Sequence, residues 1–487
     1  MQAGLYNLNE FKDNCGFGLI AHIQGKASHR VLKTAIEALT SMTHRGGIAS
    51  DGKTGDGCGL LLQKPDHFMR DLALSLFDEK LPKLYAIGSV MLSQDKKYRD
   101  QAKITVEKNL KDQGLKIVGW RKVPTNNDCL GQIAIKTLPV IEQIFISVEN
   151  LDEQNFNARL FLAKRKSEIA LALDNSFYIA SLAENVISYK GLMMPIDLPK
   201  FYPDLANPLL ETAICIFHQR FSTNTSPQWP LAQPFRLLAH NGEINTLAGN
   251  RNWSIARTPK LKTPLLPDLN EVAPLVNGTG SDSSSLDNML EFMVAGGIDL
   301  HKAVRMLVPP AWDNNQEFGL DERAYFEYMA MHMEPWDGPA GIVITDGRYA
   351  VCTLDRNGLR PSRWVLTDDN IITVASEVGV YEYDPKNVTS KGRLGPGGML
   401  SIDTKSGNIM NAAQIDKELA AANPYQAWLN DNTIKIISSM DDESIEVEGV
   451  LSREKIRNFM KMFLVSLEER DQILRPLAEG GQEAVGS

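Results

Sequence analysis

The stretch Asp13-Asn14-Cys15-Gly16-Phe17-Gly18-Leu19-Ile20-Ala21-His22 places one thiol between a polar leader and an apolar segment. The apolar residues from Gly16 to His22 predict a buried strand, with Cys15 at its start. A free cysteine in such a place is most often a small buried hydrophobic residue. If the leader, residues 1–14, is removed, Cys15 also carries an α-amino group with a pKa of roughly 7.7–8.0, which can accept the proton of the thiol. The stretch alone leaves both interpretations open.

The composition is that of an ordinary globular enzyme and excludes several classes of protein. The chain has 487 residues, of which 43% are hydrophobic and 23% are charged. A formal net charge of −9 argues against nucleic acid and against an anionic membrane as a partner. There is no apolar run of about 18 residues, and the leader lacks the apolar region of a secretory signal. We therefore expect neither a membrane span nor a nucleic-acid site.

The five cysteines are scattered along the chain and show no CxxC spacing. This pattern argues against a disulfide framework, against a zinc ribbon and against ligation of an iron–sulfur cluster. We therefore expect no metal site and no cofactor in this chain. Free thiols are typical of a reducing compartment, so the sequence predicts a cytoplasmic protein.

Alternating helix and strand signals predict an α+β fold built in layers. Ser28 can cap a helix whose apolar residues keep a helical period. Two blocks rich in strand signals, residues 177–222 and 340–375, follow later in the chain. A helical insert from about residue 285 to 333 lies between them. After about residue 410 the signals turn helical.

Two helices are expected in this last part of the chain, at residues 412–422 and 453–474. Proline cannot continue a helix from within, so Pro424 would end the first and Pro476 the second.

One nucleotide-binding motif is matched by its letters but not by its context. Residues 47–54 fit the pattern GxxxxGK[ST] of phosphate-binding loops. Such loops lie between a strand and a following helix, whose N-terminus faces the phosphate. Here a helix is expected before the match and a strand, Leu60 to Leu62, after it. The carboxylates of Asp51 and Asp56 would also repel phosphate, so we predict a tight surface loop.

Residues near position 241 could stabilise a tetrahedral intermediate formed by Cys15. Attack of a thiolate on an amide requires hydrogen-bond donors for the oxyanion. The turn His240-Asn241-Gly242-Glu243 offers an amide side chain and an unhindered backbone N–H. An Asn-Gly pair is more often only a turn, so this feature is weak by itself.

Two further residues could hold an amino-acid substrate. Arg220 ends an apolar strand, and its planar guanidinium suits a carboxylate held by two hydrogen bonds. Asp282 lies in a small-residue loop and suits an ammonium group. Singly, Arg220 is more often a surface ion-pair partner and Asp282 a helix cap. Together with the thiol they favour hydrolysis of the glutamine amide through a thioester.

Six short stretches occur in the order found in one enzyme family, and the sequence resembles the class II glutamine amidotransferases. The stretches are Cys15-Gly-Phe-Gly18, Thr43-His-Arg-Gly46, Arg220-Phe-Ser-Thr223, His240-Asn-Gly-Glu243, Gly280-Ser-Asp282 and Leu354-Asp-Arg-Asn-Gly-Leu-Arg360. Two longer stretches, residues 51–62 and 333–340, resemble the large subunits of bacterial-type glutamate synthases in particular. The resemblance covers essentially the whole chain.

The resemblance implies a fold and a division of the chain. The fold would be a four-layer αββα N-terminal-nucleophile sandwich with a helical insert. Residues 1–14 would be a propeptide and residues 15–415 the glutamine amidotransferase domain. Residues 416–487 would be a linker and the start of a following central domain that is cut short.

The resemblance also implies roles for seven residues. Cys15 would be the nucleophile and its new α-amino group the base, and the products would be glutamate and ammonia. The other implied roles are an oxyanion hole from Asn241 and Gly242, a carboxylate site at Arg220, an α-amino site at Thr223 and Asp282, and ordering of the thiol end by Arg45.

In the intact glutamate synthases, ammonia passes to 2-oxoglutarate on a barrel that carries FMN. Electrons arrive through an iron–sulfur cluster, from a small partner subunit or from ferredoxin. The resemblance therefore places both cofactors outside this chain, with L-glutamine and the other domains of the parent chain as partners. Two rivals remain: another class II amidotransferase with a phosphoribosyl, sugar or aspartyl acceptor, and a non-catalytic module in which Cys15 is never unmasked.

Overall fold

The computed structural model describes residues 15–221, 226–313, 315–434 and 451–481. The chain divides into two compact units, Met1–Leu429 and Asn430–Ser487. Within the described residues no helix is both long and apolar enough to cross a membrane.

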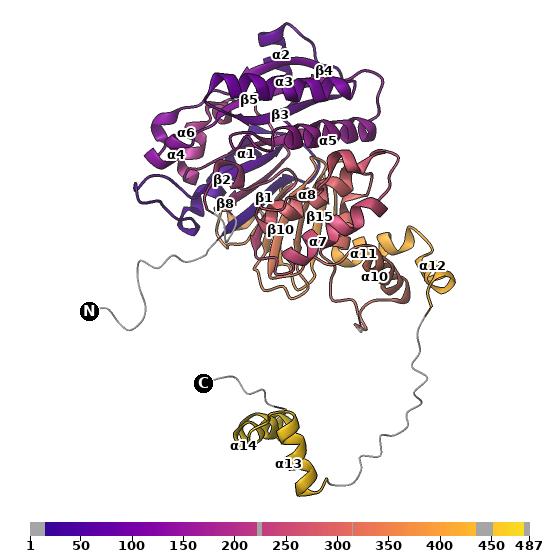
Figure 1. Cartoon of the computed structure of the whole chain (residues 1–487). Coiled ribbons are helices and arrows are strands. Elements are labelled where there is room, and N and C mark those ends of the chain that lie inside the picture. The colour runs from indigo at the N-terminus through magenta and orange to yellow at the C-terminus, as the bar shows by residue number, and fades with distance from the viewer. Residues whose placement is uncertain (1–14, 222–225, 314, 435–450, 482–487) are drawn as a thin grey trace, which may run out of the picture. The chain divides into compact units, whose positions relative to one another are not determined.

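The first sheet of the larger unit contains the strand that follows Cys15. In order, its strands are β14 (Val388–Arg393), β12 (Arg363–Thr367), β13 (Ile371–Ala375), β1 (Gly16–His22), β8 (Ile214–Gln219), β2 (Cys58–Gln63) and β7 (Val186–Gly191). β1 lies inside the sheet, antiparallel to both β13 and β8 (Figure 1). Gly16 pairs with Gln219 at the end of this ladder.

A second sheet packs face to face against the first. In order, its strands are β16 (Asn408–Asn411), β15 (Met399–Asp403), β11 (Tyr349–Leu354), β10 (Ala340–Thr345) and β9 (Leu238–Gly242). Phe17 and Leu19 of β1 belong to the same buried cluster as Val343 of β10. Side chains alternate between the two faces of a strand, so Ile20 belongs to a different cluster on the other face. The two sheets therefore share one apolar core.

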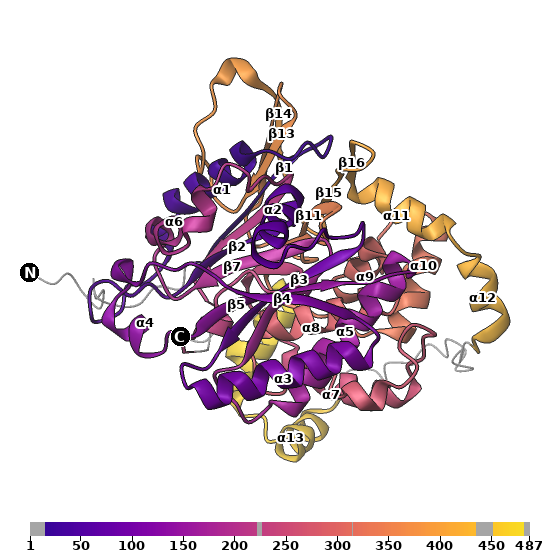
Figure 2. The same ribbon diagram turned by 90° about the horizontal axis from the view of Figure 1, so that it is seen from above.

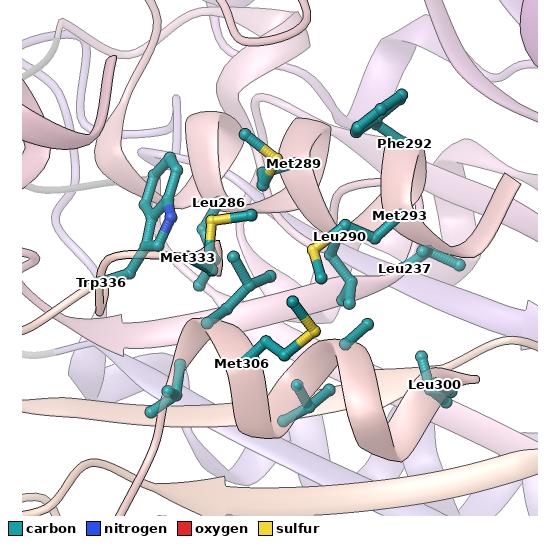
Figure 3. Packing of buried hydrophobic residues seen from close by; sticks show 14 of the residues in the cluster. Leu237, Leu286, Met289, Leu290, Phe292, Met293, Leu300, Met306, Met333 and Trp336 are labelled. Atoms are coloured by element: carbon teal, nitrogen blue, oxygen red, sulfur yellow. The ribbon is translucent and has the colours of Figure 1, made fainter. Parts of the chain in front are cut away.

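Helices cover the outer face of each sheet. α1 (His29–Ser41) packs on the first sheet, and Ser28 caps it as predicted, accepting the N–H of Val31 at 3.4 Å. α8 (Asp282–Ala295), α9 (Leu300–Leu307) and α10 (Leu320–His332) share a buried cluster with Ile342 of the second sheet. Figure 3 shows side chains of this cluster, including Met289, Met306 and Trp336, pointing toward one another. The predicted αββα layers and helical insert are confirmed.

A third sheet was not expected from the sequence. In order, its strands are β4 (Lys116–Lys122), β5 (Val140–Ser147), β3 (Tyr85–Leu92) and β6 (Tyr178–Ala183). Its helices are α2 (Asp66–Phe77), α3 (Lys96–Asp112) and α5 (Glu153–Ala170), and Figure 2 shows α3 and α5 close to its strands. Ala102 of α3 and Phe156 of α5 pack against Val90 of β3 in one buried cluster. This sheet is joined to the first by the short turn between β6 and β7.

The loop at residues 47–54 has the predicted context. It lies between the helical turn η1 (Thr43–Arg45) and β2, so a helical segment precedes it and a strand follows it. The carboxylate of Asp51 accepts the backbone N–H groups of Thr54 at 2.8 Å and Ile133 at 2.9 Å. These hydrogen bonds hold the pKa of Asp51 below its usual range. By accepting these backbone hydrogen bonds, the Asp51 carboxylate holds the loop in its folded conformation.

The remaining helices of the larger unit are α4 (Gln132–Lys136), α6 (Leu198–Phe201), α7 (Leu247–Arg257), α11 (Ala412–Ala421) and α12 (Tyr425–Asn432), whose last residues belong to the smaller unit. α11 agrees with the helix expected at 412–422. It spans the predicted domain boundary at residue 415, and the larger unit continues to Leu429.

The smaller unit corrects one expectation. Its helices are α13 (Arg453–Met462), α14 (Leu467–Glu469) and α15 (Arg475–Gly480). A single helix at 453–474 is wrong, because Leu464 adopts φ +55° and the side chain of Ser466 then caps a new helix. Pro476 lies in the first turn of α15, which follows the π-helical turn Arg470–Leu474 without a break. The helical run that begins at Leu467 therefore continues through Pro476, where we expected a helix to end before it.

A buried ion pair fixes α11 to α9. Arg305 donates from Nε and Nη2 to the two carboxylate oxygens of Asp416, at 2.7 and 2.9 Å. Both side chains are buried, and Arg305 also donates to the carbonyl oxygen of Gly397 at 3.0 Å. The pair joins α9, α11 and the segment before β15.

We expect Asp416→Ala to lower the free energy of unfolding by about 3–5 kcal/mol, because it leaves the Arg305 guanidinium buried without its counter-charge. Urea unfolding followed by circular dichroism measures the change. Lys417→Ala, on the exposed side of the same helix, is the control and should shift stability by less than about 0.5 kcal/mol. A loss below about 1 kcal/mol in Asp416→Ala would mean that α11 contributes little to the larger unit.

Candidate active site

The ladder between β1 and β8 brings Cys15 and Arg220 to one edge of the first sheet. Gly16 pairs with Gln219, so the residues just beyond this pair, Cys15 and Arg220, are neighbours across the two strands. The Sγ atom of Cys15 lies 3.8 Å from the carbonyl oxygen of Phe221. Cys15 itself is half-buried.

The end of β9 brings the turn at Asn241 to the same edge. The Asn241 side chain donates from Nδ2 to the carbonyl oxygen of Cys15 at 3.0 Å. A primary amide has two N–H donors on this nitrogen, so one remains to serve a ligand. β9 belongs to the second sheet, and the site therefore forms where the edges of both sheets meet.

Gly242 is required by the backbone at this turn. Its φ is +138°, a conformation that residues with a Cβ rarely adopt, and a Cβ there would overlap the carbonyl oxygen of Pro339. Gly242 pairs with Ala340 across the ladder between β9 and β10. The turn is thus held close against the start of β10.

Arg220 is a buried residue rather than a surface ion-pair partner. Only 3% of it is exposed, and its Nε lies 3.1 Å from Oδ2 of Asp56. Its backbone has φ +94°, a strained value for arginine, and its N–H donates to the carbonyl oxygen of Gly57 at 2.7 Å. The loop that carries Asp56 therefore fixes the direction in which the chain leaves β8.

Asp56 is a component of the site that the sequence did not point to. In the sequence it counted only as a charge that would repel phosphate. In the structure its Oδ2 accepts the backbone N–H of Gly47 at 2.8 Å. Burial raises the pKa of this carboxyl group to about 6, although the N–H of Gly47 and the charge of Arg220 act in the opposite direction. Glycines on both sides, Gly55 and Gly57, were the available signal for an inward turn.

Asp282 lies behind the Asn241 turn. It is the first residue of α8, and Ser281, not Asp282, caps the helix. The Asp282 carboxylate accepts the backbone N–H of Ile244 at 3.0 Å and that of Ser283 at 2.7 Å. Its Oδ2 lies 3.7 Å from Nδ1 of His240. The described contacts therefore join Asp282 to the segment that follows β9.

Two further residues, His218 and Gln233, hold the backbone beside the thiol. The ring nitrogens of His218 lie 2.8 Å from the carbonyl oxygen of Arg220 and 3.1 Å from that of His240. Burial lowers the pKa of His218 to about 3. The Gln233 amide accepts the N–H of His240 at 2.8 Å and donates to its carbonyl oxygen at 3.2 Å. A polar residue inside the apolar strand β8 was the one signal for His218.

Arg45 lies beside the start of β1. A Cβ on Gly16 would be 3.5 Å from Cγ of Arg45, so the stem of this side chain passes next to the residue that follows Cys15. The Arg45 guanidinium donates from Nε to Glu377 at 2.9 Å. Thr223 lies outside the described residues.

The structure thus brings Cys15, Arg220, Asn241, Gly242 and Arg45 to one place and joins Asp282 to it through the chain after β9. Residues 15–428 match the family model described as glutamine amidotransferases class-II. The chain belongs to this family. Cys15 is therefore a cysteine at the start of a strand in a class II glutamine amidotransferase.

Curated relatives resemble the chain over nearly its whole length. The glutamate synthase [NADPH] large chain of Bacillus subtilis is 39% identical over 495 residues, which cover 99% of this chain and 32% of the relative. That of Azospirillum brasilense is 38% identical and covers 100% and 32%. The ferredoxin-dependent glutamate synthase of Pyropia yezoensis is 36% identical and covers 99% and 32%. The chain spans about a third of the length of these relatives.

The described residues show free thiols and no cluster of metal-binding side chains. No group of three or more His, Cys, Asp and Glu side chains in the part of the chain that the structure describes could hold a metal ion. All five cysteines are free thiols, and Cys58, Cys215 and Cys352 are buried. Cys15 and Cys129 are the two that reach the surface in part.

We expect Gly242→Ala to lower the free energy of unfolding by more than about 2 kcal/mol, because alanine at this φ is strained and its Cβ would displace Pro339. Chemical unfolding followed by tryptophan fluorescence measures the loss. Gly249→Ala in α7 is the matched control: no atom lies near its Cβ position, and alanine there should stabilise the helix by about 0.5–1 kcal/mol. Equal stability of Gly242→Ala and the parent would contradict the requirement for glycine.

Proposed function

We propose that this chain is the glutamine-hydrolysing part of a glutamate synthase. The observation that carries the proposal is the contact between Asn241 Nδ2 and the carbonyl oxygen of Cys15, a residue that neighbours Arg220 across the ladder between β1 and β8. This arrangement of a donor, a thiol-bearing residue and a cation supports a site that holds an amide, its oxyanion and an α-carboxylate together. The names of the relatives, which match nearly the whole of this chain, support the choice of glutamate synthase.

The reaction begins with removal of residues 1–14, which gives Cys15 a free α-amino group. Near neutral pH this α-amino group is unprotonated in a fraction of the molecules, and there it can accept the proton of the thiol. The base and the nucleophile then belong to one residue. His218 is a poor alternative base, since burial lowers its pKa to about 3 and its ring faces two backbone carbonyl oxygens.

The thiolate attacks the side-chain amide carbon of glutamine and forms a C–S bond, while the electron pair of the C=O bond moves to oxygen. The free N–H of the Asn241 side chain and the backbone N–H of Gly242 stabilise this oxyanion. Collapse of the intermediate breaks the C–N bond, and the α-ammonium of Cys15 returns its proton to the leaving group. Ammonia leaves, and a thioester remains on Cys15.

Water then completes the reaction. The α-amino group takes a proton from water as its oxygen attacks the thioester carbon, and the same oxyanion donors act again. The C–S bond breaks, the sulfur recovers its proton, and glutamate leaves. During both steps Arg220 would hold the α-carboxylate by two hydrogen bonds, and Asp282 with Thr223 would hold the α-amino group. Arg45 would keep the thiol end of the site in place through its pair with Glu377.

In the longer protein, ammonia would pass to 2-oxoglutarate for reductive synthesis of glutamate. The FMN and the iron–sulfur cluster that supply the electrons would belong to parts of the parent that this chain does not contain. The partners would be those other domains and an electron donor, either a small subunit or ferredoxin. The free state of all five cysteines supports a reducing, cytoplasmic setting.

We expect Cys15→Ser to abolish the release of ammonia from glutamine, because a hydroxyl is a much weaker nucleophile than a thiolate at neutral pH. Intact mass, read first for loss of residues 1–14 from the parent, establishes that the chain has been processed. A coupled glutamate dehydrogenase assay then measures ammonia. Cys129→Ser, at the other partly exposed thiol, is the control and should keep the parent rate. Ammonia release by Cys15→Ser, or an uncut and inactive parent, would favour the non-catalytic module.

We expect Asn241→Ala to lower kcat by roughly 10²–10³, the usual cost of losing one oxyanion donor. KM for glutamine should change much less, since the amide acts on the transition state. Asn245→Ala, on the exposed side of the same segment, is the control and should stay within a few-fold of the parent. A drop of less than tenfold in Asn241→Ala would mean that another group binds the oxyanion.

A further inference from the structure

The mechanism above assigns Arg220 to the substrate but leaves Asp56 without a task. The two side chains are buried against each other, with 3.1 Å between Arg220 Nε and Asp56 Oδ2. Their backbones are also joined, because the N–H of Arg220 donates to Gly57, the residue after Asp56. The guanidinium that would receive the α-carboxylate of glutamine is therefore already in contact with one carboxylate.

The Asp56 carboxylate is only partly satisfied by its surroundings. Its Oδ2 accepts the N–H of Gly47 at 2.8 Å, but among the described residues its Oδ1 has no hydrogen-bond partner. Asp56 is 6% exposed, so water reaches it poorly. The ionised form of this buried carboxylate is favoured first by the N–H of Gly47 and then by the guanidinium of Arg220.

Among the residues that the structure describes, few charges face Asp56 from the elements packed around it. From the end of β8 comes the guanidinium of Arg220, which favours the ionised carboxylate. From β2 comes Cys58, a buried thiol whose own pKa is raised by burial and by Asp56. On the other side, a Cβ on Gly46 would lie 3.0 Å from Asp56 Oδ1 and would overlap the neutral amide of Gln219. Among the described residues, Arg220 is the cation that faces Asp56, and its charge adds to the effect of the Gly47 N–H.

Arrival of a substrate changes this balance. An α-carboxylate on Arg220 would put a second negative charge next to Asp56, and both carboxylates would share one guanidinium. Two carboxylates in one buried site do not both stay ionised at neutral pH, because each raises the pKa of the other. Asp56 is the one with the unsatisfied oxygen, and an O–H at Oδ1 removes its charge.

We propose that Asp56 is a positioning residue that holds Arg220 in place for glutamine and takes up a proton when the α-carboxylate of glutamine binds. The inference rests on the proposed function, in which Arg220 receives this carboxylate. It adds a linked proton to substrate binding, separate from the protons that the α-amino group moves during hydrolysis.

The sign of the pH effect follows from linkage. Burial places the pKa of Asp56 in the free protein at about 6, and bound glutamine raises it further. Below pH 6 Asp56 is protonated in both states, so no proton is taken up and affinity does not depend on it. Above pH 6 the free protein has lost the proton that the complex needs, and Kd for glutamine rises by up to tenfold per pH unit.

Isothermal titration calorimetry tests the proposal on the processed chain, which begins at residue 15. Cys15→Ala in this chain prevents turnover. L-Glutamine is titrated from pH 5.5 to 8.5, in pairs of buffers with different ionisation enthalpies, so that the heat reports the number of protons bound. We expect uptake of 0.5 to about 1 proton near pH 7 and a Kd that rises about five- to tenfold from pH 6.5 to 7.5.

Asp56→Asn in the same background assigns the proton. It should remove most of the uptake and flatten the pH dependence of Kd, whereas the control Asp71→Asn, an exposed carboxylate on α2, should leave both unchanged. The amine at position 15 titrates in the same range, so uptake that persists in Asp56→Asn belongs to that amine and overturns the proposal. So does glutamine binding with no proton uptake in the Cys15→Ala chain, a result that needs no Asp56 variant.

Arg220→Ala separates this inference from the function on which it rests. Loss of glutamine binding, by about a hundredfold or more, supports the carboxylate site. Unchanged binding in Arg220→Ala would overturn the carboxylate assignment itself. If Arg220→Ala loses glutamine binding as expected but the Cys15→Ala chain takes up no proton, only the proposed role of Asp56 is overturned.

Discussion

The antiparallel pairing of β1 with β8 is the constraint on which the rest of the site depends. It places the residue before β1 next to the residue after β8, although they are separated by about two hundred positions in the chain. A slip of one residue would turn every side chain of β1 to the opposite face of the sheet. Gly18 helps to exclude such a slip, because any side chain there would overlap the ring of Phe217 on β8.

Local sequence patterns were sufficient for most helices and strands and for the layers they form. Continuous apolar runs in β1 and β8 indicate strands buried on both faces, and such strands need covering layers on each side. The third sheet could not be found in this way. Its strands β3, β5 and β6 are recognisable as apolar runs, but their pairing depends on contacts between distant segments. The break at Leu464 was missed for a related reason, because apolar periodicity continues through a residue that leaves the helix.

The site shows the same division between local and distant information. Cys15, Asn241 and Gly242 lie in short motifs whose residue types suggest a chemistry, and they are neighbours in the structure. Asp56 and His218 acquire their significance only from contacts with partners that sequence order does not reveal. Asp56 was even interpreted as a feature that excludes a ligand. Buried polar residues whose partners are backbone groups show no recognisable sequence pattern. They can be assigned to a site only from the folded structure.

The position of β1 inside its sheet has a consequence for a chain that begins at Cys15. Chain ends usually fray, because their backbone groups have no neighbours on one or both sides. Here the second residue of such a chain is already paired with β8, and the third is joined to Ser376 through its N–H at 3.1 Å and its carbonyl oxygen at 3.0 Å. The new terminus is therefore held within two residues, by β8 on one side of β1 and by Ser376 on the other. Its amine loses its conformational freedom when the sheet folds, so little entropy is left to be lost when it acts as a base.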